Sequence, residues 1–187
     1  MNQKLVNFGL FQAIYFACVL GARDGRPWIG ALAALLLLPC NLWFFRKPLW
    51  AAEIRLWATA GLIGLVVDSG LYSAGVIAFP SAALPLGGGG AWAFIVPPWI
   101  VVLWVTVGST LNGSLGWLRG RMRLAALLGA VGGPLSFWSG QRLDATALPL
   151  NAWSFLALAI EYAVLFPILL KLAERFGDHS APMTDAL

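Results

Sequence analysis

Two carboxylic acids lie in the middle of long apolar stretches and are the residues best placed to do chemistry. Asp68 is near the centre of the apolar segment 54–79, and Glu161 is near the centre of the segment 153–172. A charged carboxylate at the bilayer centre costs about 2.5–3.5 kcal/mol on insertion scales. Each acid is therefore expected to face protein or water, where it pairs with a donor, carries a proton or binds a ligand.

Other polar side chains in or near the apolar segments could share a site with the two acids. Tyr72 lies one helical turn after Asp68, so the two side chains share a helix face. Arg142 could extend outward to the membrane interface or turn inward to bind an anion or a carboxylate. The candidate substrate-binding residues are Gln12, Asp68, Tyr72, Asn112, Ser136, Arg142 and Glu161.

Two interpretations of these polar groups stay open. They could only bond neighbouring helices and fix their register, or they could line a polar cavity used for substrate binding or proton transfer. The sequence has no Gly-x-Ser-x-Gly element, phosphate loop or dinucleotide fingerprint, so no catalytic residue is predicted and enzymatic activity is left open.

Metal ions and cofactors are not expected. The chain has two cysteines and one histidine, and the histidine, His179, lies in the polar tail. A zinc or haem site would need more such ligands within the apolar segments. Cys18 and Cys40 are expected at opposite membrane faces, so a disulfide between them is not expected.

The composition indicates that lipid surrounds most of the chain. Of the 187 residues, 60% are hydrophobic and 11% are charged, whereas soluble domains are about 25% charged. One soluble core of this size could not bury so much apolar surface. Membrane lipids are thus expected partners. The net charge of +4 comes from scattered basic residues, so nucleic acid is not an expected partner.

Six apolar segments are long enough, or nearly so, to span about 30 Å as helices. We predict an all-α fold, a polytopic membrane helical bundle with six transmembrane helices. The predicted helices cover residues 4–22, 27–45, 54–79, 97–118, 122–140 and 153–172. They form one domain, residues 1–174, followed by a polar tail, residues 175–187. The segment 81–92, with its run of four glycines, is expected to be a flexible linker or a lid over a site.

The distribution of basic residues predicts the orientation of the helices. One predicted side carries nine of them: Lys4, Arg46, Lys47, Arg55, Arg119, Arg121, Arg123, Lys171 and Arg175. The other side carries three: Arg23, Arg26 and Arg142. Cytoplasmic loops are enriched in Lys and Arg, so both termini are predicted to be cytoplasmic. The first apolar segment lacks a convincing small-residue cleavage site and is interpreted as the first span.

Small residues recur along one face of several predicted helices. Examples are Gly9 in the first, Gly61 and Gly64 in the third, and Gly129 and Gly133 in the fifth. Small residues let membrane helices approach closely, so these faces predict helix contacts. In the fifth helix, Pro134 is expected to introduce a kink.

Several stretches form a pattern that resembles a known family. They are FQAIYFACVLGA at 11–22, PWIVVLW at 98–104, TLN and SLGWL within 110–118, GAVGGPLS at 129–136 and GQRL at 140–143. This pattern resembles the bacterial integral membrane family catalogued as domain of unknown function 2878. Phe137 and Asp144 depart from a tyrosine and a glycine of that pattern. The resemblance implies a multi-pass protein of the bacterial inner membrane. It supplies no activity, but the family's association with lipid-modifying genes implies a role with lipids.

Three functions are therefore considered. The first is handling of a lipid or isoprenoid-like amphiphile in a polar intramembrane cavity, as an accessory to lipid modification. The second is a small secondary transporter built on an inverted repeat of residues 4–79 and 97–172, since inverted-repeat transporters bind substrate near the midplane. The third is a non-catalytic membrane subunit. A cavity open sideways to lipid favours the first, a cavity open to water on alternating sides favours the second, and no cavity favours the third.

Overall fold

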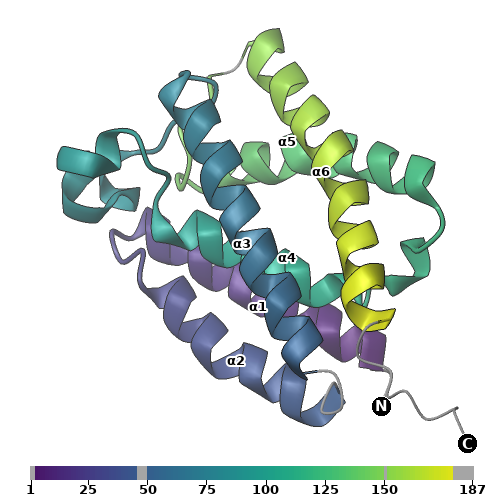
Figure 1. Cartoon of the computed structure of the whole chain (residues 1–187). Coiled ribbons are helices and arrows are strands. Elements are labelled where there is room, and N and C mark those ends of the chain that lie inside the picture. The colour runs from purple at the N-terminus through teal and green to yellow at the C-terminus, as the bar shows by residue number, and fades with distance from the viewer. Residues whose placement is uncertain (1–2, 46–49, 150, 179–187) are drawn as a thin grey trace, which may run out of the picture.

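The computed structural model describes residues 3–45, 50–149 and 151–178, and these residues form six α-helices (Figure 1). Within these ranges no strand occurs, so the predicted all-α fold is confirmed. The helices are α1 (Gln3–Arg23), α2 (Ile29–Phe45), α3 (Trp50–Ser73), α4 (Pro98–Leu111), α5 (Met122–Arg142) and α6 (Ala152–Asp178).

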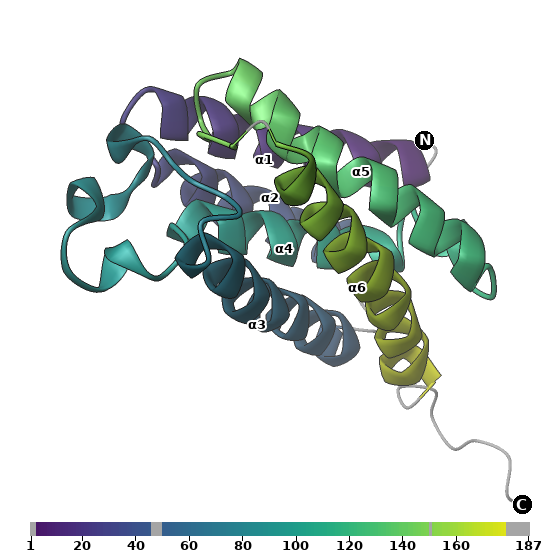
Figure 2. The ribbon, with the colours of Figure 1, turned by 90° about the horizontal axis from the view of Figure 1, so that it is seen from above.

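The helices run back and forth between two ends of the molecule, with α4 in the middle (Figures 1 and 2). The start of α1 and the end of α6 lie at the same end, together with the connection between α4 and α5. Helix α4 packs against α1, α2, α3 and α6, whereas α5 packs mainly against α6. The short helix α4 is therefore the element around which the longer helices are arranged.

The outer surface of the bundle is apolar. The exposed residues Leu156, Ile160, Val164 and Ile168 form a stripe along α6 at intervals of four residues. In α2, Leu35 is 69% exposed. A large exposed apolar surface of this kind indicates contact with lipid or with other proteins.

Three helices, α1, α3 and α6, are long and apolar enough to cross a membrane. These helices fit a membrane protein, as predicted. The prediction of membrane-spanning helices is thus supported for three of the six helices. Of the other three, α2 and α4 are apolar but shorter, and α5 does not meet the same limits.

Helix α4 ends at Leu111, seven residues before the predicted end at Leu118. Asn112, Gly113 and Ser114 follow directly and favour a turn, and the side chain of Asn7 in α1 binds the backbone at this point. Its Nδ2 donates a hydrogen bond to the Ser109 carbonyl at 3.1 Å, and its Oδ1 accepts one from the Ser114 N–H at 2.9 Å. A side chain at Gly113 would collide with the Asn7 amide. A polar residue from another helix therefore satisfies the backbone groups that end α4.

Helix α3 ends at Ser73, before the predicted end at Phe79, because Gly75 adopts a left-handed conformation with φ +70°. The Val76 N–H then bonds to the Leu71 carbonyl at 2.9 Å, which terminates the helix in the manner common for glycine. At the other boundaries the structure extends α5 and α6 beyond the predicted residues and begins α2 at Ile29, after a turn.

The segment between α3 and α4 is wound into three short 3₁₀ helices, η2 (Ser81–Ala83), η3 (Pro85–Gly88) and η4 (Gly90–Ala93). The first of these, η2, packs against α1. The Ala83 carbonyl accepts a hydrogen bond from the Trp99 indole N–H at 3.0 Å. This segment is thus attached to the bundle and does not form an extended linker.

Several glycines permit the close contacts between helices. A side chain at Gly30 would collide with Cys18 between α2 and α1, and one at Gly61 would collide with Val105 between α3 and α4. The prediction of small-residue contacts therefore holds for these helices. It fails for Gly9, which has no atom near the position of a Cβ.

Helix α5 continues through Pro134 to Arg142.

Candidate functional site

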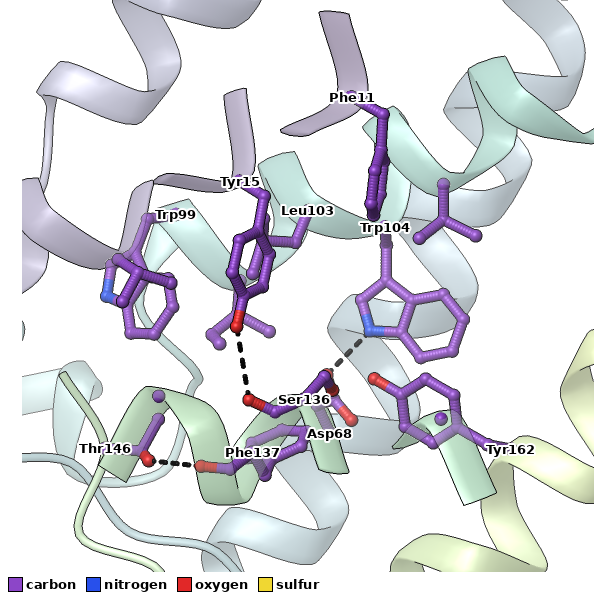
Figure 3. Close-up of a pocket in the computed structure, with 15 residues that line it drawn as sticks. Phe11, Tyr15, Asp68, Trp99, Leu103, Trp104, Ser136, Phe137, Thr146 and Tyr162 are labelled. Atoms are coloured by element: carbon purple, nitrogen blue, oxygen red, sulfur yellow. Dashed lines mark hydrogen bonds between the residues drawn. The ribbon is translucent and has the colours of Figure 1, made fainter. Parts of the chain in front are cut away.

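The bundle contains a partly open cavity of about 170 Å³. Its walls come from α1, α3, α4, α5, α6 and the segment after α5 (Figure 3). The lining residues are Phe11, Tyr15, Val19, Asp68, Trp99, Ile100, Leu103, Trp104, Val107, Gly132, Ser136, Phe137, Gly140, Thr146 and Tyr162. Most of this lining is aromatic or aliphatic, with a few hydroxyl groups and one carboxyl group.

That carboxyl group belongs to Asp68 of α3, whose side chain is fully buried. Its Oδ2 accepts a hydrogen bond from the Trp104 indole N–H at 2.7 Å (Figure 3). Gly64, one helical turn before Asp68, makes room for this indole, because a side chain there would collide with Trp104. The glycine, the indole and the acid therefore form one unit at the contact of α3 and α4.

Glu161 of α6 lies beside Asp68 without lining the cavity. Its carboxyl group is buried and lies next to the Asp68 carboxyl, but no hydrogen bond joins the two groups in the structure. A hydrogen bond between them would require a proton on one of the two acids, because an ionised carboxylate only accepts. No N–H or hydroxyl group of the described residues donates to Asp68 Oδ1 or to either oxygen of Glu161.

Tyr162 of α6 covers the Trp104 indole on the cavity side. The two rings stack with their centroids 5.0 Å apart and their planes 24° from parallel. The Tyr162 hydroxyl points toward Asp68 and Ser136 (Figure 3). A side chain at Gly133 would collide with the Tyr162 ring, so this glycine lets α5 approach α6 at the cavity.

Hydroxyl groups line the side of the cavity between α1 and α5. The Tyr15 hydroxyl lies 2.5 Å from the Ser139 hydroxyl and also approaches the Ser136 carbonyl at 3.4 Å. The Ser136 hydroxyl donates to the Gly133 carbonyl at 2.8 Å, which is a common use of serine inside a helix. Tyr15 is therefore the direct polar contact between the two helices at this point.

Aromatic packing and a tight turn close one end of the cavity. Trp99 is held by its bond to Ala83 and by an edge contact with Phe79, whose ring centroid is 5.7 Å away. Thr146, in the turn after α5, donates to the Phe137 carbonyl at 3.0 Å. These contacts fix two of the lining residues in place.

A second, more open hollow adjoins the cavity between α1 and α5. It shares Phe11, Tyr15, Gly132 and Ser136 with the cavity. Its other lining residues are Gln12, Phe16, Leu135, Trp138, Ser139, Arg142 and Leu143. We call this hollow the α1–α5 groove. Its shared residues connect the cavity with the outer surface of the bundle.

Arg142 lies at the edge of this groove and is exposed. Its guanidinium group lies 5.1 Å from the centroid of the Trp138 ring, a cation–π contact. The side chain is therefore on the outside of α5, beside the groove, and does not line the cavity.

The seven predicted site residues are distributed over three places. Asp68 and Ser136 line the cavity, and Glu161 contacts Asp68 from behind. Gln12 and Arg142 line the groove. The remaining two lie elsewhere: Tyr72 packs edge-on against Phe79, and Asn112 at the end of α4 accepts a hydrogen bond from Arg119.

Among the cavity residues that were not predicted from the sequence are Tyr15, Trp104 and Tyr162. Trp104 carried a usable signal, because an indole N–H in the middle of an apolar segment needs a buried acceptor. Tyr162 directly follows Glu161 in the chain, so its position next to a predicted site residue was a second usable signal.

Within the described ranges, no cluster of three or more His, Cys, Asp or Glu side chains could hold a metal ion. Cys18 is buried and Cys40 is exposed, and both are free thiols.

Comparison with known proteins gives one match. A family model described as "Protein of unknown function (DUF2878)" matches residues 4–168. No curated protein and no solved structure matches the chain.

Proposed function

The chain belongs to the DUF2878 family, and we propose that it binds a lipid or isoprenoid-like amphiphile within the membrane. The observation that carries this proposal is that the cavity adjoins the α1–α5 groove and shares four lining residues with it. Where apolar helices face lipid, a groove between two of them is an entrance for molecules dissolved in the bilayer. The proposed role is to hold the amphiphile as an accessory to lipid modification.

Helix packing supports a sideways entrance at this place. Helix α1 packs against α2 and α4, and α5 packs against α6, but α1 and α5 make little contact with each other. Gly132 of α5 lines both the cavity and the groove, and no atom lies near the position of a Cβ there. The passage from groove to cavity is therefore bounded by a glycine that leaves space open.

We also propose that all six helices lie in the bacterial inner membrane with both termini in the cytoplasm. The nine-to-three distribution of basic residues supports this orientation. The position of the start of α1 and the end of α6 at one end of the bundle agrees with an even number of crossings (Figure 2). The shorter helices α2 and α4 would then cross the membrane together with the residues at their ends.

A Gly132→Leu variant tests the proposed entrance. No atom lies within 4 Å of the position of a Cβ at Gly132, so the protein is expected to fold, and the rest of the leucine side chain extends into the space between groove and cavity. Wild-type protein in lipid nanodiscs would be irradiated with a diazirine-bearing oleyl alcohol, and the labelled peptides would be mapped by mass spectrometry. We expect labelling of the α1 and α5 segments at the groove in the wild type, and several-fold less in the variant.

Gly9→Leu is the matched control, because Gly9 is exposed on α1 and also has open space around it. Its labelling should equal that of the wild type. Equal labelling of wild type and Gly132→Leu would contradict the entrance. Labelling spread evenly over all lipid-facing helices would favour a non-catalytic subunit without a binding site.

A small secondary transporter is the second candidate, and the buried acid pair supports it, since intramembrane acids often carry protons. The packing of the helices does not support the expected inverted repeat. Helix α1 packs closely on α2, whereas its counterpart α4 makes little contact with α5. Solute uptake into proteoliposomes driven by a pH gradient would favour this candidate over the first.

A further inference from the structure

The chemistry of the cavity narrows the choice of amphiphile, and we infer that the protonated amine end of the molecule enters the cavity and binds Asp68. This inference rests on the proposed function and names the group that the site recognises. It depends on three features of the cavity: the pair of acids beside it, its unused hydrogen-bond acceptors and its aromatic walls.

The two acids beside the cavity have no basic partner. Neither Asp68 nor Glu161 forms an ion pair with a Lys or Arg in the part of the chain that the structure describes. Two ionised carboxylates in contact repel each other strongly, so such a pair holds at least one proton. The second carboxyl group is surrounded by apolar side chains, and it ionises only where a cation beside it offsets the cost of burying the charge.

The acceptors of this pair are only partly used. Trp104 donates to Asp68 Oδ2, but Asp68 Oδ1 receives no donor from the described residues. Asp68 borders the cavity from a fully buried position, so a bound molecule contacts its carboxyl group once the side chains over it shift slightly. An ammonium group carries three N–H donors and one positive charge, and therefore satisfies both the acceptor and the charge.

Six aromatic rings line the same cavity: Phe11, Tyr15, Trp99, Trp104, Phe137 and Tyr162. The faces of aromatic rings attract cations, most strongly where water is excluded. A neutral hydroxyl group would use the free acceptor but would gain neither this attraction nor the pairing of charges. The lining therefore favours an ammonium ion over an alcohol of the same size.

The volume limits how much of the ligand enters. An apolar cavity of about 150 Å³ holds one benzene molecule, so a cavity of about 170 Å³ holds an ammonium group with a few carbon atoms. The rest of an alkyl chain would continue into the α1–α5 groove, which is lined by Phe11, Phe16 and Leu135. The site thus fits an amine at the end of an apolar chain.

Three probes with the same six-carbon chain test the inference: hexylamine, 1-hexanol and hexanoate. At pH 7 hexylamine is protonated, as a lysine side chain is with its pKa of about 10.4. Isothermal titration calorimetry would measure binding to the full chain in nanodiscs, with empty nanodiscs as the blank for partitioning into lipid. We expect hexylamine to bind about 10- to 100-fold more tightly than hexanol, the range for one charge-assisted hydrogen bond. Hexanoate is expected not to bind.

The Asp68→Asn variant removes the charge and keeps an oxygen that can accept from Trp104. Its affinity for hexylamine should fall by about 10-fold or more, while its affinity for hexanol should change little. Glu174→Gln, which removes an acid of α6 outside the cavity, is the control and should bind hexylamine like the wild type. If Asp68→Asn does not fold, the comparison of the three probes on the wild-type protein still tests the inference.

The outcomes separate this inference from the proposed function. Hexanol binding as tightly as hexylamine, or unchanged hexylamine binding by folded Asp68→Asn, would overturn the amine inference and leave an amphiphile site. Absence of binding by all three probes, together with absence of groove labelling, would overturn both.

Discussion

At the scale of single residues, the position of Trp104 depends on the absence of a side chain at Gly64. The indole lies where a Cβ of residue 64 would be, and from there it donates to Asp68. We expect Gly64→Ala to lower the free energy of unfolding by about 1–3 kcal/mol, the usual cost of forcing atoms into a packed core. Gly70→Ala, on the same helix with open space around it, should be neutral or stabilising by up to about 1 kcal/mol. Unfolding of both variants in detergent measures the difference, and equal stability would contradict the proposed contact.

The hydrogen bond between Trp104 and Asp68 can be measured separately. Trp104→Phe keeps an aromatic ring but leaves Asp68 Oδ2 without its donor, so we expect a loss of about 1–3 kcal/mol. In the Asp68→Asn background the same change should cost less, because the amide is not charged. A double-mutant cycle of unfolding free energies gives the coupling between the two residues. A coupling near zero would show that the bond does not contribute to stability.

Asp68 and Glu161 could be identified from the sequence because placing a charged carboxyl group in the middle of a membrane costs free energy. Such a residue is therefore expected to have a structural or functional role. Trp104 and Tyr162 were missed because aromatic side chains are expected in apolar segments and do not stand out. Tyr72 was placed in the site by helical spacing, yet its ring packs on Phe79. A shared helix face gives the direction of a side chain but not the neighbouring helix that it meets.

At the scale of elements, the end of α5 depends on a residue in an unusual conformation. Asp144 has φ +57°, and around it the Ala145 N–H bonds to the Gly140 carbonyl at 2.9 Å. This is the helix end that glycine usually forms, and the left-handed conformation costs other residues about 1–2 kcal/mol. We expect Asp144→Gly to stabilise the protein by about 1 kcal/mol or less, since glycine also increases the entropy of the unfolded chain. Thermal unfolding checks this, and Asp144→Ala is the control: a similar gain with alanine would mean that removal of the charge, not of the strain, is responsible.

The sequence predicts where the helices are better than it predicts where they end. The six apolar segments correspond to the six helices, because hydrophobic periodicity and length are local properties. The end of α4 has a local and a long-range cause. Asn112, Gly113 and Ser114 directly after Leu111 favour a turn. Asn7, more than one hundred residues earlier in the chain, also bonds to both Ser109 and Ser114, and this second contact cannot be predicted from the local sequence.

At the scale of the whole molecule, the short helices set a condition on how the bundle sits in a membrane. Helix α4 has 14 residues, which at 1.5 Å per residue give about 21 Å, less than the hydrocarbon thickness of about 30 Å. Helices α1, α3 and α6 are long enough to cross the membrane by themselves. If α4 crosses the membrane, the segments at its two ends, including η4 and η5 (Gly116–Leu118), must lie within the thickness of the bilayer. Non-helical backbone is tolerated there only where it is covered by protein.

The last prediction concerns the orientation that follows from six crossings. The segment 81–92 lies at the opposite end of the bundle from the start of α1 and the end of α6 (Figures 1 and 2). We therefore expect a reporter fused at Thr184 to be cytoplasmic and a reporter inserted between Gly87 and Gly90 to be on the outer side. Paired fusions of alkaline phosphatase and green fluorescent protein at each site measure this, because the first is active only outside and the second fluoresces only inside. Reporters on the same side would contradict six crossings and would mean that α4, α5 and α6 together cross an even number of times. The α1–α5 groove would then not need to face lipid, and the sideways entrance would lose its basis.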